Sequence, residues 1–176
     1  MNREDFDPGP LADVDCHASG DRWTLVMVRD LRHPPAKVWE ALTDPARLAQ
    51  WAPFTTDRNL AGLGSATLTM IDGDTSMELA ASVRQADPPR LLEYTWGSDV
   101  LRWELVGSDT GTQLTLRHTV EERGTAPKIA AGWHLCLAVA ERLLGGAPIA
   151  PIRGADALNY GWEELNNSYA NKLGMR

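Results

Sequence analysis

Cysteine and positive charge are both scarce in this sequence. Of its 176 residues, only Cys16 and Cys136 are cysteines, and they form no CxxC or Cys/His ligand pattern. Lys and Arg number 17 against 24 Asp and Glu. The net charge of −7 argues against nucleic acid as a partner, because phosphate binding needs clustered basic residues. There is no HExxH motif and no pair of histidines at helical spacing, so no metal is expected.

Motifs for nucleotide binding and for serine hydrolases are missing too. The sequence contains no GxGxxG, no phosphate loop and no GxSxG, and we expect no cofactor. Residues 1–21 are acidic and lack the apolar core of a signal peptide. The most apolar long stretch, residues 129–144, contains His134, Glu141 and Arg142, which is not typical of a membrane span. We therefore expect a cytoplasmic protein with reduced cysteines.

Strand patterns make up most of the chain. Residues 1–10 show no periodicity and are expected to form a flexible arm. A turn at SGD, residues 19–21, predicts a hairpin between about 11–17 and 22–31. Alternating apolar residues separated by short turns then predict an antiparallel meander. Its strands are expected over residues 65–71, 77–86, 90–96, 100–106 and 112–121.

Helical patterns occur in two places. Between the hairpin and the meander, Pro35 and Asp44–Pro45 begin two helices that end near Leu42 and Trp51. Both are too short to be stable alone, so they must pack against the rest of the chain. After the meander, a long helix is expected from about 125 to the glycines at 145–146. A last amphipathic helix is predicted over about 154–173, with an apolar stripe of Leu158, Trp162, Leu165, Tyr169 and Leu173.

This order of elements predicts one α+β domain over residues 11–176. In it, a curved antiparallel sheet wraps around the long helix and the two short helices close one end. The stretches RDLRHPPAKVWEALTDPARLAQW, DPPRLLEYTW and GWEELNNSYANKLG resemble a bacterial branch of proteins related to the C-terminal domain of the activator of the heat-shock-protein ATPase. That branch belongs to the START-related helix-grip superfamily, SRPBCC. The resemblance covers about residues 22–174 and implies an apolar cavity between the sheet and the long helix.

Tryptophan is unusually frequent and supplies the candidate binding site. Any single tryptophan on an inward face is more simply explained as a core residue. Together, however, large rings opposite a line of small residues on the long helix, Gly132, Cys136 and Ala140, are typical of a pocket for an apolar or aromatic ligand. The candidate ligand-binding residues are Trp39, Trp51, Met70, Trp96, Trp103, His118, Trp133, Cys136 and Ala140.

His118 is the most informative polar residue, because it lies between Leu116 and Val120 on an apolar strand face. It is either a core histidine with a hydrogen-bond partner or a polar anchor inside the cavity. Three functions follow. The first, which we favour because no catalytic motif is present, is binding of a small hydrophobic ligand without catalysis. The second is an enzyme of polyketide cyclase or dehydratase type with His118 as its catalytic residue. The third, implied by the resemblance, is an interaction module with a chaperone partner.

Overall fold

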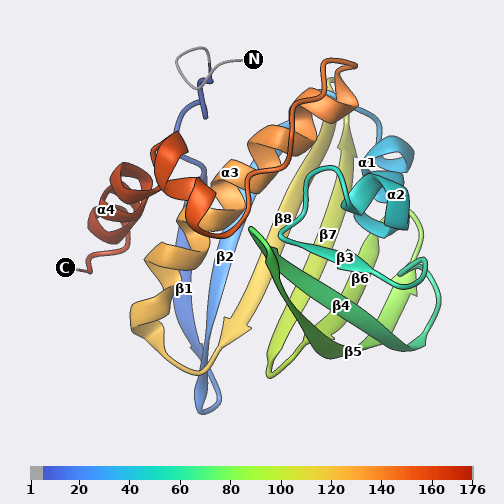
Figure 1. Cartoon of the computed structure of the whole chain (residues 1–176), viewed down its shortest axis with the longest axis horizontal. Coiled ribbons are helices and arrows are strands. Elements are labelled where there is room, and N and C mark those ends of the chain that lie inside the picture. Colours follow the sequence, from blue (N-terminus) through green and yellow to red (C-terminus); the bar gives the residue numbers. More distant parts are fainter. Residues whose placement is uncertain (1–5, 176) are drawn as a thin grey trace.

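The computed structural model describes residues 6–175 of the chain, and within them a single antiparallel sheet dominates (Figure 1). Its strands are β1 (Asp13–Ser19), β2 (Arg22–Leu31), β3 (Phe54–Thr56), β4 (Gly64–Asp72), β5 (Thr75–Asp87), β6 (Leu91–Trp96), β7 (Asp99–Ser108) and β8 (Gly111–Val120). They lie in the order β1-β2-β8-β7-β6-β5-β4-β3. The N-terminal hairpin therefore pairs with the last strand, and the meander from β8 back to β3 forms the rest of the sheet.

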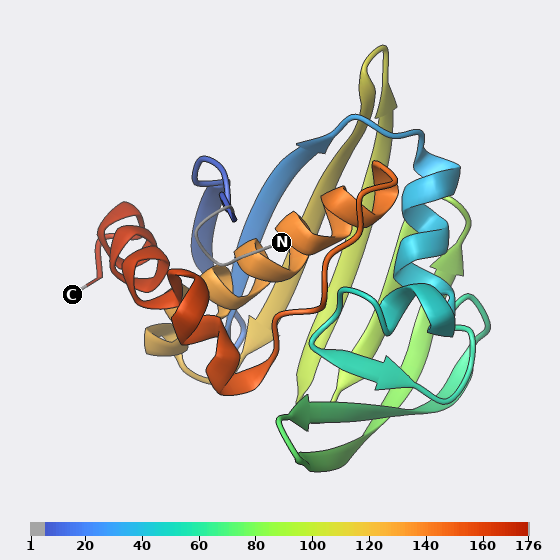
Figure 2. The ribbon, with the colours of Figure 1, turned by 45° about the horizontal axis from the view of Figure 1, so that its top comes forward.

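The helices cover one face of this sheet. They are α1 (Pro35–Thr43), α2 (Pro45–Leu48), α3 (Ala126–Leu144) and α4 (Trp162–Lys172), with 3-10 turns η2 (Arg123–Thr125) and η3 (Gly154–Tyr160). The long helix α3 runs across the sheet, while α1 and α2 lie over one end of it (Figures 1 and 2). Side chains from the inner face of the sheet and from α3 form one core, in which Leu101, Trp103 and Val139 are fully buried. The predicted α+β helix-grip fold is confirmed.

Local signals explain most element boundaries. Pro35 and Pro45 each occupy the first turn of a helix, and the Asp44 carboxylate accepts a hydrogen bond from the Ala46 N–H at the start of α2. The second helix is shorter than predicted, because it ends at Leu48 instead of near Trp51. Strand β3 was not predicted at all. Three residues are too few for an alternating pattern to be recognised.

The C-terminal prediction needs a correction. Instead of one helix over residues 154–173, the chain forms η3, then Gly161 in the left-handed conformation at φ 86°, then α4. A left-handed residue ends the first segment and changes the direction of the side chains that follow. As a result Leu158, expected on the buried stripe, is 60% exposed, whereas Leu165 and Tyr169 are buried.

Residues 1–5 of the predicted flexible arm lie outside the described residues, but the rest of the arm makes contacts. The ring of Phe6 lies edge-on to Tyr160 with ring centroids 5.4 Å apart, and the guanidinium of Arg142 stacks over Phe6. The Pro8 carbonyl hydrogen-bonds a side chain of α3. Phe6 and Pro8 therefore contact η3 and α3, whereas Asp7, Gly9 and Pro10 are exposed.

Candidate functional site

A pocket of about 180 Å³ opens beside α3, and we call it the α3 pocket. Most of its wall is apolar. Its lining residues are Pro53, Trp96, His118, Ile129, Gly132, Trp133, Leu135, Cys136, Ile152, Arg153, Gly154, Ala157 and Trp162. The sheet supplies Trp96 and His118, the first half of α3 supplies the opposite side, and the residues that follow α3 close the pocket from outside. The site thus combines Pro53, two strands of the sheet and the stretch from α3 to the start of α4.

The sheet side of the pocket is set by a tight turn. Gly97, at φ 59°, and Ser98 connect β6 to β7 and make Trp96 and Asp99 direct cross-strand partners. Asp99 lies two residues before Leu101, the residue opposite His118 on β8, so alternation puts Asp99 and His118 on the same face. The turn therefore places an aromatic ring, a carboxylate and an imidazole together at one end of the inner face.

The outer side is formed by residues 145–161, which we call the strap. The strap leaves the end of α3 and runs back beside that helix toward α4 (Figures 1 and 2). Arg153 fastens it to the short-helix region, because Nε donates to the Ala52 carbonyl at 2.9 Å and Nη2 to the Ala49 carbonyl at 2.8 Å. At its other side the Asp72 carboxylate accepts from the Ala155 N–H at 3.1 Å. Residues 153–155 of the strap are thus held by hydrogen bonds on both sides.

Gly154 explains why the strap can approach so closely to β4. Its φ of +55° is strained for other residues, and a Cβ there would collide with the Asp72 carboxylate. Gly132 on the opposite wall differs, because a Cβ added there would meet no atom within 4 Å. Space is therefore available above Gly132 on α3, in the pocket itself.

The interior behind the pocket is filled by tryptophans. The ring of Trp133 lies 5.2 Å from Trp103, 6.0 Å from Trp96 and 6.4 Å from Trp51, measured between centroids. The first two contacts are edge-on, a favourable arrangement for aromatic pairs. The space between the sheet and α3 behind Trp133 is therefore filled by side chains, and the open volume lies on the Trp96 side of Trp133.

The contacts of His118 define its protonation. Its Nδ1 lies 2.9 Å from the indole Nε1 of Trp133, and its Nε2 lies 2.8 Å from Oδ2 of Asp99. Since an indole N–H only donates, Nδ1 accepts and carries no proton, and Nε2–H donates to the carboxylate. Both ring nitrogens are occupied and the side chain is 2% exposed. His118 acts as a hydrogen-bonded link between β7, β8 and α3, with neither nitrogen left for a ligand.

Two other polar side chains of the pocket wall, Trp96 and Arg153, have N–H groups that take part in no hydrogen bond in the described chain. Nε1 of Trp96 is buried and has no hydrogen-bond partner within residues 6–175. Leaving such a donor without a partner costs about 1–3 kcal/mol. Arg153 uses Nε and Nη2, and in the described part of the chain no carboxylate forms an ion pair with it. Burial lowers the pKa of Arg153, which nevertheless stays a cation. Burial also raises the pKa of Cys136 to about 12, so its thiol is neutral.

The structure brings together four of the nine candidate residues. Trp96, His118, Trp133 and Cys136 line the α3 pocket. Trp51 and Trp103 are fully buried behind it and contact Trp133. The remaining candidates pack elsewhere in or around the core: Trp39 on α1, Met70 on β4 and Ala140 toward the end of α3.

The wall residues that the sequence did not suggest come mainly from the strap. Ile152 and Arg153 belong to a stretch without periodicity, and Ala157 lies in the predicted last helix but outside its apolar stripe. Trp162 was placed on the packing stripe of the last helix. Asp99, which hydrogen-bonds His118, lies in a predicted turn, and aspartate is common in turns for local reasons that indicate no site.

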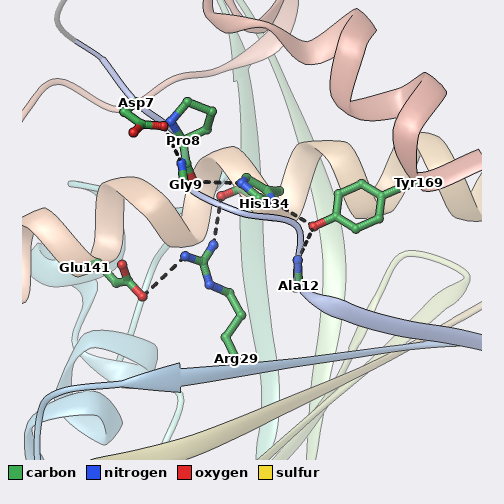
Figure 3. Close-up of polar contacts among 8 residues, drawn as sticks. All are labelled: Asp7, Pro8, Gly9, Ala12, Arg29, His134, Glu141 and Tyr169. Atoms are coloured by element: carbon green, nitrogen blue, oxygen red, sulfur yellow. Dashed lines mark hydrogen bonds and ion pairs between the residues drawn. The ribbon is translucent and has the colours of Figure 1, made fainter. Parts of the chain in front are cut away.

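A second polar cluster lies on the other flank of α3 (Figure 3). His134 points from α3 toward Tyr169 of α4 and toward the N-terminal segment, and it is fully buried. Its Nε2 donates to the Pro8 carbonyl at 2.8 Å, while its Nδ1 lies 2.6 Å from the Tyr169 hydroxyl. That hydroxyl also accepts from the Ala12 N–H at 2.9 Å. One imidazole and one phenol thus join both ends of the described chain to α3.

The charge state of His134 follows from this cluster. Burial lowers the pKa of His134 below its usual 6.5, the hydrogen bond to Pro8 opposes that change, and the nearby Arg29 cation lowers the pKa further. Arg29 also donates to the His134 carbonyl at 3.4 Å and pairs with Glu141 at 3.3 Å. A neutral His134 accepts from Tyr169 and donates to Pro8, which satisfies every polar atom of the ring.

Metal sites and membrane-spanning helices are two further features to consider. Among residues 6–175, no three His, Cys, Asp or Glu side chains gather in a way that could hold a metal ion. Of the helices in that same range, none combines the length and apolar character needed to cross a membrane.

Comparison with protein families matches residues 32–145 to the family described as Activator of Hsp90 ATPase homolog 1-like protein. The match covers more than half of the chain, and the chain belongs to this family. This agrees with the resemblance found in the sequence. Comparison with curated proteins gives no match.

Solved structures with the same fold come from several bacteria. EF2215 from Enterococcus faecalis, a conserved protein of unknown function, is 19% identical with a TM-score of 0.68 over 90% of this chain and 89% of that one. CalU16 from Micromonospora echinospora is 17% identical with a TM-score of 0.65 over 91% and 95%. DynU16, from the dynemicin biosynthetic locus, is 25% identical with a TM-score of 0.63 over 74% of this chain and 51% of its own. The first two similarities show the fold alone.

Proposed function

We propose that this protein binds a small apolar or aromatic molecule in the α3 pocket. The observation that carries the proposal is the pocket itself: an open volume with tryptophan and isoleucine walls and few polar groups. That composition is typical of small-molecule sites. DynU16, a similar chain, is encoded in a biosynthetic locus, a setting that fits a small organic ligand.

The size of the pocket limits the ligand. An apolar cavity of roughly 150 Å³ is enough to hold benzene, whereas sites for drug-sized molecules span about 300–1,000 Å³. The α3 pocket, at about 180 Å³, therefore matches one aromatic ring. A larger molecule would place one ring between Trp96 and α3 and extend out of the mouth.

The contacts of His118 argue against the enzymatic alternative. A general base must present a free nitrogen within hydrogen-bond reach of its substrate. Here Nδ1 is bonded to Trp133 and Nε2 to Asp99, so the imidazole would first have to give up one of these partners. The chaperone alternative rests on the family description alone, and direct binding to a purified Hsp90 would be its test.

Toluene is a suitable first probe, because it carries one ring and no polar group. Ligand at ten times its dissociation constant stabilises the native state by about 1.4 kcal/mol. For a domain of this size that corresponds to a rise of about 3–5 °C in melting temperature. We also expect toluene to change the tryptophan fluorescence, since three wall residues are tryptophans.

Two variants at one position provide the control. Gly132→Leu puts a side chain into the open space of the pocket and should abolish the response to toluene, while Gly132→Ala should keep most of it. Neither substitution meets neighbouring atoms at Cβ, so both proteins should fold. Absence of any toluene effect in the natural protein, or an equal effect in Gly132→Leu, would contradict the proposal.

A further inference from the structure

The polar atoms of the α3 pocket define the ligand more narrowly than its apolar walls do. We propose that the pocket selects an aromatic ring that bears a carboxylate, with the ring beside Trp96 and Trp133 and the carboxylate on Arg153. This inference rests on the proposed function, because it names the ligand class of the same site.

The first step is an inventory of donors and acceptors among the wall side chains. His118 has no free nitrogen, because both are bonded within the protein. The neutral thiol of Cys136 is a weak donor. The Trp96 N–H is buried and is not exposed to the pocket, so Arg153 supplies the available donors, its N–H groups beyond the two that bind carbonyls. The side chains of the wall thus offer donors and no strong acceptor, so a matching ligand must accept.

The second step concerns charge. Arg153 is half-buried, and the two groups it is known to bind, the carbonyls of Ala49 and Ala52, are uncharged. Asp72 lies on the other side of the strap, but its carboxylate accepts from the Ala155 N–H and no ion pair joins it to Arg153. A guanidinium without a carboxylate partner, beside an apolar pocket, favours an anionic ligand group.

The third step is geometry. The two carbonyl bonds fix the guanidinium of Arg153 on the strap, so it does not have to be ordered when a ligand binds. The pocket holds about one ring, and Arg153 on the strap lines it. A ring between Trp96 and α3 can therefore direct its carboxylate to Arg153, whose side chain is partly exposed, so that the carboxylate keeps contact with water and its desolvation is limited.

Benzoate and toluene form a matched pair of probes, since they differ only in a carboxylate that replaces a methyl group. Hydrogen bonds to charged groups contribute enough to change affinity roughly ten- to a hundredfold. We expect benzoate to bind at least about tenfold more tightly than toluene at low salt, and this preference should decrease as salt is added. Titrations followed by the indole N–H signals of 15N-labelled protein would measure both affinities.

Variants of Arg153 test the assigned contact. Arg153→Gln should abolish the preference for benzoate, and Arg153→Lys should retain part of it. Arg58→Gln is the matched control. Arg58 also binds backbone carbonyls, those of Ser65 and Gly64 among them, but it does not line the pocket. Toluene binding in each variant reports whether the pocket is still formed.

The possible outcomes separate the two proposals. If toluene binds and benzoate binds no better, the carboxylate inference is wrong while the proposed function holds. If benzoate is preferred equally in Arg153→Gln, another group binds the anion and the assignment to Arg153 is overturned. If neither probe binds the natural protein, both the proposed function and this inference fail.

Discussion

The substitution Tyr169→Phe removes one oxygen atom from a buried site and keeps the aromatic ring in place. Tyr169 is fully buried, and its hydroxyl serves two partners at once, the Ala12 N–H at 2.9 Å and Nδ1 of His134 at 2.6 Å. Without the hydroxyl, one buried donor and one buried acceptor lose their hydrogen bonds. At about 1–3 kcal/mol for each of these two unsatisfied groups, we expect a loss of about 2–6 kcal/mol in the free energy of unfolding.

A second tyrosine gives a control for this experiment. The hydroxyl of Tyr94 is also buried but accepts only one hydrogen bond from a side chain, that of the Trp103 indole at 3.2 Å. Tyr94→Phe should therefore cost about 1–3 kcal/mol, near half the effect of Tyr169→Phe. Urea denaturation at pH 7.5 would measure both as changes in midpoint at constant slope. If Tyr169→Phe costs no more than Tyr94→Phe, the hydroxyl does not join the chain ends to α3 as described.

The same structure supports three more predictions. The pKa of His134 in the folded protein lies below 6.5, so as the pH falls the unfolded chain takes up the proton before the folded one. The stabilisation that neutral His134 provides is therefore complete above about pH 6.5 and is lost as the pH falls below that value. Unfolding midpoints between pH 7.5 and 5 should accordingly fall less in His134→Gln than in the natural protein, and equal falls would contradict this. Gly132→Ala should raise the free energy of unfolding by about 0.5–1 kcal/mol, because alanine favours the helix and the added methyl group meets no neighbour; a destabilised variant would show the space to be filled. Leu158→Ser, at an exposed position, should change the free energy of unfolding by less than about 0.5 kcal/mol, whereas Leu165→Ala, at a buried one, should lower it by about 2–4 kcal/mol. Similar values for the two variants would mean that α4 is not docked as described.

The sequence predicted the sheet well, because alternation is a local property. In β7, Leu101 and Trp103 lie inside and Arg102 lies outside, as their spacing indicates. Short turns then fix which strands are neighbours. The pairing of β2 with β8 joins distant parts of the chain, and no local pattern in the sequence predicts it.

The pocket could be predicted only in part. Alternation and helical spacing placed Trp96, His118 and Trp133 on facing surfaces, and in the structure all three line one pocket. Such patterns do not predict hydrogen-bond partners. The contacts of His118 with Asp99 and Trp133 depend on the geometry of a turn and on the rotation of α3 about its axis. Residues 145–153 of the strap have no periodicity, and their position depends on tertiary bonds from Arg153.

The last helix shows where helical spacing misleads. Leu158, Trp162, Leu165 and Tyr169 follow a regular repeat in the sequence, which assumes one continuous helix. Gly161 interrupts that helix, and its left-handed conformation separates Leu158 from the buried residues of α4. A glycine inside a helical pattern is a signal for such a break.

Toluene binding followed at the seven tryptophan indole N–H groups tests the central claim most directly. The wall residues Trp96, Trp133 and Trp162 should show saturable shifts with one common dissociation constant. Trp23 and Trp39, which do not line the pocket, should stay in place, and Gly132→Leu should abolish the shifts. A spectrum that toluene leaves unchanged, or in which Trp23 and Trp39 shift instead, would show that the α3 pocket is not a ligand site.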